Sequence, residues 1–461
     1  MIGHLGDSIA AIATPIGEGA ISVIRVSGES AIRNVANRFK GKRNLATAKS
    51  HTAHFGRIVD AKGNIVDDVV CTVFLAPTSF TGEDTIEVSC HGGIHVTRRV
   101  LECLLETGIR PAEPGEFTLR AFLNGKLDLS QAEAIADLIR AQSDKAYQTS
   151  MDQLEGSLSK EIRLIRDQLI KSVGLIELEL DFVDEDLELV DKKRFKESIE
   201  SGISAIEKLL CTYKYGKVWR EGVRVALVGV PNAGKSSLLN ALLHENRAIV
   251  TDIAGTTRDF IEEKITISGV LFRIIDTAGL RQTEDSIEQE GIKRTWKIVQ
   301  TSDIIVLVHD STKLITSDEL KFLDYIRENY SQSGLIIANN KIDLQTKKAI
   351  INIKEGLIIG TSAINHEGIM LLISELEKHV SEKSQAEGRE SVTITNERHY
   401  SALLRAKEGL SSSLESLRLR ESGEFIVLDL RRAIDAMGEI IGLVTSEDIL
   451  NSIFSKFCIG K

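Results

Sequence analysis

A glycine-rich loop with an anion-binding pattern begins at residue 229. Residues 229–236 read Gly-Val-Pro-Asn-Ala-Gly-Lys-Ser and match G-x-x-x-x-G-K-[ST]. The apolar run 223–228 before the loop indicates a buried strand, and residues 237–243 after it indicate a helix. In such an arrangement the backbone N–H groups of the loop and the N-terminus of the helix hold phosphate. We therefore expect Lys235 to reach the β- and γ-phosphates of a nucleotide and the Ser236 hydroxyl to bind Mg²⁺.

Three more motifs follow, in the order typical of guanine-nucleotide binding. Asp276 ends an apolar run and begins Asp-Thr-Ala-Gly, so its carboxylate suits Mg²⁺, and Gly279 can bring a backbone N–H up to the γ-phosphate. Residues 340–343 read Asn-Lys-Ile-Asp, and the Asp343 carboxylate is an acceptor for the two N–H donors of the guanine edge. Adenine lacks this donor pair, so the motif favours GTP over ATP. Residues 362–363, Ser-Ala, complete the set.

The segment between the phosphate loop and Asp276 has the composition of a switch. Residues 247–259 offer hydroxyls and backbone carbonyls, which are hard oxygen ligands, and Thr257 is the expected second Mg²⁺ ligand. Leu280 occupies the position at which Ras-like GTPases carry the glutamine that orients the attacking water. Because leucine cannot hydrogen-bond water, hydrolysis requires another group to position the water and another charge to stabilise the transition state.

The expected ligands of this site are GTP and Mg²⁺, and the expected contacts come from all of these segments. The contact residues are Asn232, Ala233, Gly234, Lys235, Ser236, Ser237, Thr251, Asp252, Ile253, Ala254, Gly255, Thr256, Thr257, Asp276, Thr277, Ala278, Gly279, Asn340, Lys341, Asp343, Ser362 and Ala363.

Length and composition limit the classes of protein to which the chain can belong. Its 461 residues predict two or three domains, and 42% apolar residues are enough to build their cores. The net charge of −10 means that a nucleic-acid partner requires a local basic patch rather than a global field. The sequence carries no secretory or membrane-spanning pattern, and the five scattered cysteines are typical of reduced thiols, so we expect a cytoplasmic protein.

Periodicity divides the chain into four ranges, which are residues 1–119, 120–216, 217–381 and 382–461. The first has short strand-like runs and one helix and predicts an α+β domain. The third holds the nucleotide motifs and predicts an α/β P-loop GTPase (Ras-like) domain. The second and fourth have helical spacing, and each alone would leave an apolar face in water. We therefore expect these two to pack together as one all-α domain, with the GTPase domain inserted between them.

Motifs outside the GTPase set resemble one family, the MnmE (TrmE) tRNA-modification GTPases of bacteria and organelles. These motifs are residues 13–15, 24–28, 79–84, 91–93, 114–118 and 120–129, together with the tail Phe-Cys-Ile-Gly-Lys at 457–461. The resemblance covers nearly the whole chain. It implies an N-terminal domain that binds folate and dimerises, a helical domain built from two chain segments, and an inserted GTPase domain.

The resemblance also implies an activity. Such proteins act as homodimers with an FAD-containing partner of the MnmG (GidA) type, in a heterotetramer. Together they add an aminomethyl or carboxymethylaminomethyl group at C5 of the wobble uridine of certain tRNAs. Hydrolysis depends on K⁺, which sits where other GTPases receive an arginine finger, and this fits the gap left by Leu280. The positions that match the K⁺ ligands are Asn232, Thr251, Ile253 and Thr256. Glu288 matches the acid that helps orient the water, with Glu290 as the alternative.

Four charged residues match the positions that contact 5-formyltetrahydrofolate in this family, namely Arg25, Glu87, Lys126 and Lys461. Cations suit the glutamate tail of the folate, and a carboxylate suits the N–H donors of the pterin. Without the resemblance, each would be interpreted as a surface charge. Cys458 matches a thiol proposed to be functional, although a tail cysteine can also be inconsequential.

Other interpretations remain open at this point. Cys90, His91 and His95 are metal-ligand types, but without a partner cluster they form a weak zinc pattern. The C-terminal Cys-Ile-Gly-Lys differs from a prenylation signal in its glycine and its terminal lysine. A GTP-switched binding or assembly factor, for instance for ribosomal particles, would carry the same GTPase motifs, since a fold does not fix the output of a switch. The N-terminal domain and the cysteine-containing tail favour tRNA modification.

Overall fold

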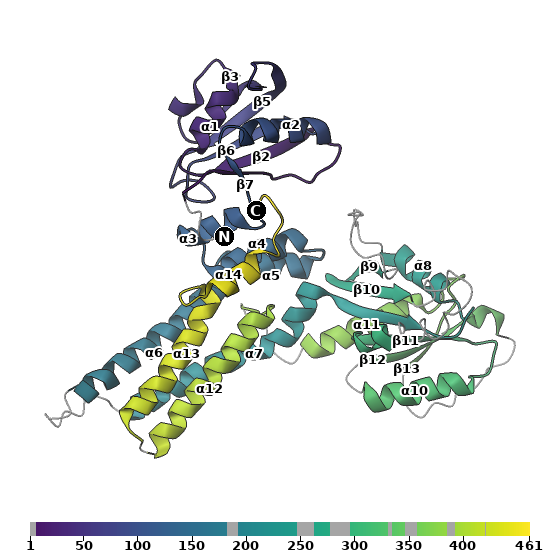
Figure 1. Cartoon of the computed structure of the whole chain (residues 1–461). Helices are drawn as coiled ribbons and strands as arrows, with labels where there is room; N and C mark the ends of the chain where they lie inside the picture. The colour runs from purple at the N-terminus through teal and green to yellow at the C-terminus, as the bar shows by residue number, and fades with distance from the viewer. Residues whose placement is uncertain are drawn as a thin grey trace. The chain divides into compact units, whose positions relative to one another are not determined.

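The computed structural model describes residues 6–181, 192–246, 262–276, 296–330, 334–345, 357–384, 392–419 and 421–461 (Figure 1). The chain divides into two compact units. The first unit comprises Met1–Ile139, Gln153–Ser204 and Ala402–Lys461, and the second comprises Arg140–Asp152 and Ala205–Ser401. The first unit is thus assembled from three separate stretches of sequence.

A seven-stranded sheet forms the N-terminal part of the first unit. Its strands lie in the order β3-β4-β5-β6-β2-β1-β7, and every neighbouring pair is antiparallel except β1 and β7. Successive side chains of a strand point to opposite faces. Ile24 and Val26 of β2 therefore enter a core shared with helices α1 and α2, whereas Arg25 points away from it. The elements are β1 (Ile9–Ile12), β2 (Ile21–Ser27), α1 (Ala31–Arg38), β3 (Phe39–Gly41), η2 (Leu45–Thr47), β4 (Thr52–Val59), β5 (Ile65–Phe74), β6 (Thr85–His91), α2 (Ile94–Leu105) and β7 (Arg110–Pro111).

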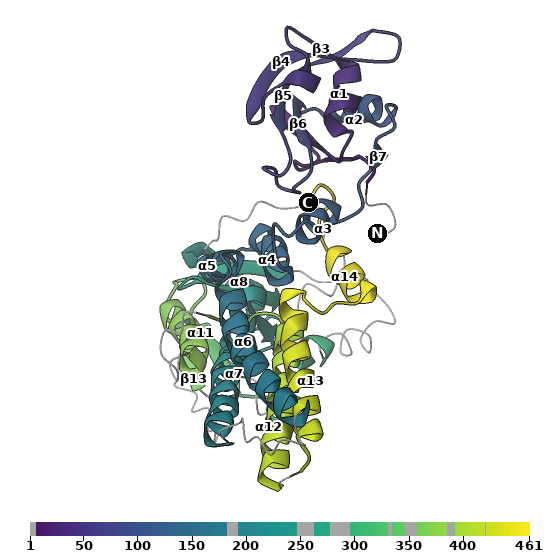
Figure 2. The ribbon, with the colours of Figure 1, turned by 90° about the vertical axis from the view of Figure 1, so that its left-hand side faces the viewer.

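Helices from distant parts of the sequence complete the first unit. Helix α6 (Ser157–Asp181) lies beside α13 (Gly423–Ile441) in both views (Figures 1 and 2), and Arg166 Nε donates to the Ile434 carbonyl oxygen at 3.0 Å. Helix α14 (Glu447–Phe454) packs on α3 (Glu116–Leu123) and α4 (Leu129–Arg140) through an apolar cluster that includes Leu119, Leu129 and Phe454. The predicted packing of the two helical segments is confirmed. Helices α5 (Asp144–Leu154), α7 (Lys192–Glu221) and α12 (Glu397–Leu419) contribute residues to both units.

The second unit is built on a six-stranded sheet in the order β13-β12-β11-β8-β10-β9. Neighbouring strands are parallel except β9 and β10. Strand β8 is apolar almost throughout because both faces are covered: Val225 and Leu227 enter one core with α8 and α11, and Ala226 and Val228 enter the other with α10. The elements are β8 (Val223–Val228), α8 (Lys235–Asn246), β9 (Glu262–Ile267), β10 (Val270–Asp276), β11 (Ile304–Asp310), α10 (Ser317–Asn329), β12 (Gly334–Asn340), η5 (Ile342–Leu344), β13 (Leu357–Gly360) and α11 (Ile369–Ser384).

These elements confirm the predicted fold class, which is a multi-domain chain with an α+β N-terminal domain, an all-α domain from two segments and an inserted α/β P-loop domain. Among the helices formed by the described residues, none combines the length and the apolar character that crossing a membrane requires.

Candidate functional site

The phosphate loop joins β8 to α8 in a conformation that two of its residues can adopt only as glycine. Gly229 has φ of 149°, and a Cβ there would lie 2.3 Å from the Val308 carbonyl oxygen. Gly234 has φ of 97°, and a Cβ there would lie 2.3 Å from Asn340 Nδ2. Both approaches are closer than carbon can make without a shift of the neighbouring atoms. The loop is therefore pressed against β11 on one side and against Asn340 on the other.

Lys235 is buried at the first position of α8. Its Nζ donates to the carbonyl oxygens of Gly229 at 2.8 Å and Val230 at 3.0 Å. The ammonium group is thus held inside the loop, close to the N-terminus of the helix. A fixed cation and the partial positive charge of a helix N-terminus both attract phosphate, so the geometry suits the role predicted for Lys235.

The two predicted Mg²⁺-binding groups of the described residues meet directly. Ser236 follows Lys235 in α8, and Asp276 ends β10, the parallel neighbour of β8. Ser236 Oγ donates to Asp276 Oδ2 at 2.7 Å. A hydroxyl and a carboxylate are hard oxygen donors, so this pair fits Mg²⁺. Thr257, the other predicted Mg²⁺ ligand, lies outside the described residues.

Asn340 connects the phosphate loop to the last of the four motifs. Its buried side chain donates from Nδ2 to the Ala233 carbonyl oxygen at 3.1 Å, and its Oδ1 accepts from the Ala363 backbone N–H at 3.3 Å. Sequence reasoning placed Asn340 among the nucleotide contacts. The structure adds a positioning role, because this one amide holds two nucleotide-binding loops at a fixed separation.

Lys341 forms a second bridge, to a residue that sequence reasoning missed. With a left-handed φ of 66°, it extends its Nζ to the Asn232 carbonyl oxygen at 2.7 Å and to Asp310 Oδ2, also at 2.7 Å. Burial alone would raise the pKa of Asp310, but the hydrogen bonds from Lys341 and Thr312 outweigh it and lower that pKa to about 2. Asp310 ends β11, just as Asp276 ends β10, so its place at the edge of the sheet was the available signal.

The carboxylate predicted to bind the guanine edge is exposed, and a hydrogen bond holds it in one orientation. Asp343 lies in η5, and its Oδ1 accepts a hydrogen bond from Ser362 Oγ at 2.6 Å. Ser362 is in turn fixed by the loop that contains it, since its Oγ accepts from the Asn365 N–H at 3.2 Å. A solvent-facing acceptor held in one orientation suits the paired N–H donors of guanine.

Several predicted contacts fall outside the described residues and stay predictions. They are Thr251, Asp252, Ile253, Ala254, Gly255, Thr256, Thr257, Thr277, Ala278, Gly279 and Glu288. The switch segment, three of the four proposed K⁺ ligands and the water-orienting acid are therefore not located. Asn232, the fourth proposed K⁺ ligand, is exposed in the phosphate loop with φ of 61°. Its amide oxygen is a suitable hard donor for an alkali cation.

A second polar site lies in the first unit, on the face of the sheet away from α1 and α2. Arg25 of β2 stands opposite Glu87 of β6, and its Nε and Nη2 donate to Glu87 Oε1 at 3.0 and 2.8 Å. The guanidinium also lies 5.3 Å from the ring centroid of Phe80 and 5.8 Å from that of Phe117. Its Nη1 is buried without a hydrogen-bond partner among the described residues. A buried donor of this kind is costly unless an acceptor satisfies it.

The C-terminal tail reaches this site. Gly460 has φ of 97°, and a Cβ there would lie 2.5 Å from the Ile12 carbonyl oxygen on β1, the neighbour of β2. The pKa of Lys461 is lowered, first by burial and then by the positive charge of Arg25, while Glu87 and Cys458 act in the opposite direction. Arg25, Glu87, Lys461 and the exposed Cys458 are therefore neighbours. Two cations, one of which is a guanidinium with an unsatisfied donor, favour an anionic ligand such as a carboxylate.

The remaining predicted residues make contacts of their own. Lys126 Nζ donates to the Pro77 carbonyl oxygen at 3.1 Å, and Lys126 is exposed. Cys90 is buried, and its Sγ donates to the Ser22 carbonyl oxygen, whereas the adjacent His91 is exposed and pairs with Asp67 at 2.6 Å. Neighbouring strand residues point to opposite faces, so Cys90 and His91 do not share a metal site. Burial raises the pKa of the Cys71 thiol to about 12, which leaves that thiol unreactive.

Comparison with known proteins covers nearly the whole chain. A family model described as the MnmE helical domain matches residues 129–458, and one described as the N-terminus of the GTP-binding protein TrmE matches residues 8–126. The tRNA modification GTPase MnmE of Christiangramia forsetii is 42% identical over 473 residues, covering 99% of this chain and 100% of its own length. The protein of the same name from Aquifex aeolicus is 44% identical over 457 residues, with 99% and 100% covered. Among solved structures, the G domain of the T. maritima FeoB iron transporter is 29% identical and covers 35% of this chain and 99% of its own, with a TM-score of 0.26.

Proposed function

The chain belongs to the MnmE family of tRNA modification GTPases and is a GTP hydrolase, and from this premise we propose that its GTPase cycle drives modification at C5 of the wobble uridine of certain tRNAs. The group added is carboxymethylaminomethyl or aminomethyl, and 5-formyltetrahydrofolate supplies the one-carbon unit. The observation that carries this proposal is the charged group formed by Arg25, its partner Glu87 and the nearby Lys461. A GTP-switched assembly factor needs no such group.

In the nucleotide site, Lys235 binds the β- and γ-phosphates, and Asp343, oriented by Ser362, reads the guanine. Ser236, Thr257 and, through water, Asp276 would hold Mg²⁺, which supplies positive charge at the phosphate oxygens. The support is the contact between Ser236 and Asp276 at one edge of the sheet. Asn340 and Lys341 hold the loops that carry these groups in fixed positions relative to one another.

Hydrolysis in this proposal depends on K⁺. Asn232 would bind the ion through its amide oxygen, together with Thr251, Ile253 and Thr256, and K⁺ supplies the charge that an arginine finger supplies elsewhere. Glu288 helps to orient the attacking water. Leu280, which offers no hydrogen bond to water, is the feature of this sequence that calls for such help.

In the first unit, Arg25, Glu87 and Lys461 bind one part of the folate, where the two cations face its oxygen acceptors and Glu87 accepts from its N–H groups. The buried Nη1 of Arg25 supports this assignment, because an oxygen acceptor of the ligand would satisfy it. Lys126, which is exposed and bonded to the Pro77 carbonyl oxygen, contacts the glutamate tail in this proposal. Cys458, the exposed thiol three residues before Lys461, takes part in the transfer in this proposal.

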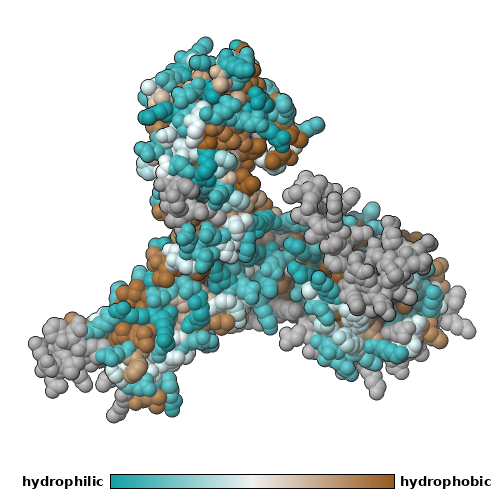
Figure 3. Space-filling view, viewed as in Figure 1, coloured by the Kyte–Doolittle hydropathy of each residue, from teal (hydrophilic) through white to brown (hydrophobic). Residues whose placement is uncertain are grey.

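We further propose a homodimer that joins an FAD-containing partner of the MnmG type in a heterotetramer on tRNA, in the cytoplasm. The support for the dimer is apolar surface on the N-terminal sheet. Phe55 of β4 and Val70 of β5 are cross-strand neighbours, and both are exposed (70% and 39%). Figure 3 shows further apolar surface on the N-terminal part of the chain, in the region of β2, β6 and α2. The proposed domains are residues 1–119 for folate and dimerisation, 120–216 with 382–461 for the helical domain, and 217–381 for the GTPase.

Nucleoside analysis of tRNA from a strain that lacks this gene tests the proposal. We expect an unmodified wobble uridine that the wild-type gene restores. Arg25→Ala should fail to restore it and should weaken 5-formyltetrahydrofolate binding in calorimetry, while its GTP hydrolysis is retained. Arg57→Ala is the matched control, since Arg57 also pairs with a carboxylate across this sheet, with Asp68 at 2.8 Å, but at an exposed position. Normal wobble uridine in the deletion strain would refute the function and favour an assembly factor.

A further inference from the structure

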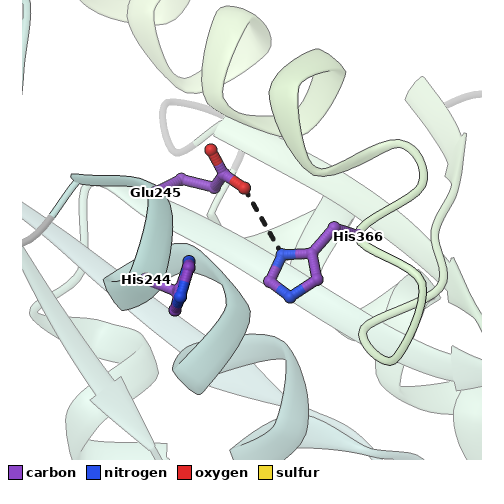
Figure 4. A group of neighbouring side chains, drawn as sticks. All are labelled: His244, Glu245 and His366. Carbon is purple, nitrogen blue, oxygen red and sulfur yellow. Dashed lines mark ion pairs between the residues drawn. The ribbon is translucent and has the colours of Figure 1, made fainter.

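Two histidines and a glutamate lie together in the second unit, outside every nucleotide motif (Figure 4). Glu245 Oε1 and His366 Nδ1 are 3.4 Å apart, and the rings of His244 and His366 have centroids separated by 5.4 Å. One ligand atom from each of the three side chains lies within 4.8 Å of the others. All three side chains are exposed, so they are accessible to an ion from solvent.

These three residues come from two segments of the second unit. His244 and Glu245 are consecutive residues in the last turn of α8, and His366 lies in the loop between β13 and α11. His366 has a left-handed φ of 58°, which is uncommon for a residue with a side chain. The loop is held on both sides, because the Ser362 N–H donates to the Glu367 carbonyl oxygen at 2.9 Å and Gly368 is pressed against Gly360. His366 is thereby presented to the end of α8.

The donor set and its spacing match a transition-metal site. Zinc binds histidine nitrogen and carboxylate oxygen at about 2.0–2.2 Å, so two ligands of a tetrahedral ion are about 3.4 Å apart. The separation of Glu245 and His366 already has this value, and a modest rotation of the exposed His244 side chain brings in the third ligand. We propose that His244, Glu245 and His366 bind a divalent transition-metal ion of the Zn²⁺ class, with water in the fourth position.

The ordinary alternative is an exposed ion pair between Glu245 and His366. That pair engages His244 only through its ring contact with His366, whereas a metal ion uses all three side chains as ligands. An imidazole at each of two positions also favours Zn²⁺, Co²⁺ or Ni²⁺ over Mg²⁺, which prefers oxygen ligands. Such a site is therefore distinct in its chemistry from the Ser236 and Asp276 pair.

The site has a structural consequence for the nucleotide-binding loops. Helix α8 begins at Lys235 and ends at Asn246, and the loop that carries His366 also carries Ser362 and Ala363. A bound ion would join the end of this helix to the loop that orients Asp343. An ion that binds only the folded chain stabilises it in proportion to its occupancy.

Cobalt titration of the full-length chain, freed of metal with a chelator and kept without nucleotide and Mg²⁺, tests the site. We expect saturable binding with the visible absorption of a tetrahedral ion and without the thiolate-to-metal band that Cys211 or Cys458 would give. Zn²⁺ should displace the Co²⁺ and raise the Tm. His366→Gln, Glu245→Gln and His244→Gln should each weaken Co²⁺ binding by at least about tenfold and abolish the Zn²⁺-dependent rise in Tm.

His51→Gln is the control, since His51 is an exposed histidine of the first unit. It should bind Co²⁺ as the wild type does. Absence of saturable binding in the wild type, or equal binding in the wild type and in all three cluster variants, would overturn the proposal. Because each cluster residue is exposed, its replacement leaves the cores of the second unit intact, and GTP hydrolysis by the variants confirms that they are folded.

Discussion

Replacing Asn340 by alanine removes the amide that holds two nucleotide-binding loops together. The side chain is 1% exposed, and it contacts the Ala233 carbonyl at 3.1 Å and the Ala363 N–H at 3.3 Å. Leaving a buried polar group unsatisfied costs about 1–3 kcal/mol. With two such groups, partly relieved by water, Asn340→Ala should lower the free energy of unfolding of the second unit by about 2–4 kcal/mol. GTP affinity should fall by at least about tenfold, or about 1.4 kcal/mol.

The preceding residue supplies a matched control. Asn339 is also buried, but its Oδ1 has no hydrogen-bond partner among the described residues. Removing an unsatisfied group releases its desolvation cost, so Asn339→Ala should change stability by less than about 1 kcal/mol. Urea unfolding followed by tryptophan fluorescence measures the effect in the right place, because both tryptophans, Trp219 and Trp296, belong to the second unit. Equal losses in the two variants would refute the bridging role of Asn340.

Three further predictions concern the nucleotide site. Asp343→Asn should weaken GTP binding and admit xanthosine nucleotides in a competition assay, and unchanged GTP affinity would contradict its guanine-reading role. Exchange of K⁺ for Na⁺ at constant ionic strength should suppress GTP turnover, whereas equal rates in both salts would remove the case for K⁺. The folded pKa of Asp310, about 2, lies below its ordinary 3.8, so its stabilising contribution is complete above pH 3.8 and is lost as the pH falls toward 2. Asp310→Asn should flatten the dependence of Tm on pH in that window. If the dependence is unaltered, then groups other than Asp310 cause it.

The local sequence pattern was sufficient to predict several strands and the phosphate loop of the second unit. The apolar run at 223–228 became β8, because a parallel strand buried on both faces needs nearly continuous apolar sequence. The apolar run that ends at Asp276 became β10. The phosphate loop and Asp276 followed from spacing alone. Strand β9 (Glu262–Ile267) was missed, since an edge strand with charged residues lacks that pattern.

The contacts that position the site residues join parts of the chain that are far apart in sequence. The periodicity of a sequence describes only local structure, so it does not predict such contacts. The bridges from Asn340 to Ala233 and from Lys341 to Asp310 became visible only in the fold. The same holds for the approach of Lys461 to Arg25, which sequence reasoning could suggest only through family resemblance.

A buried ion network joins residues from three of the motifs that resemble the family. Arg120 is 1% exposed, and its side chain bonds to Asp7, Glu83 and Glu116. Glu83, Glu116 and Arg120 all lie within the motifs that resemble the family, yet here they tie α3 to the N-terminal sheet. Those motif residues therefore maintain the fold, whereas we propose that Arg25, in the motif at 24–28, and its partner Glu87 bind a ligand. The residue types in the motifs alone could not distinguish the structural role from the ligand-binding role.

The return of residue 461 to the strand that carries Arg25 has a consequence for biosynthesis. A ribosome releases all the strands of the N-terminal sheet early, but Lys461, the second cation of the proposed anion site, emerges only with the tail. The proposed site therefore lacks that cation during most of synthesis. Proteolytic trimming of the tail would remove the same cation from a mature molecule and leave Arg25 without it.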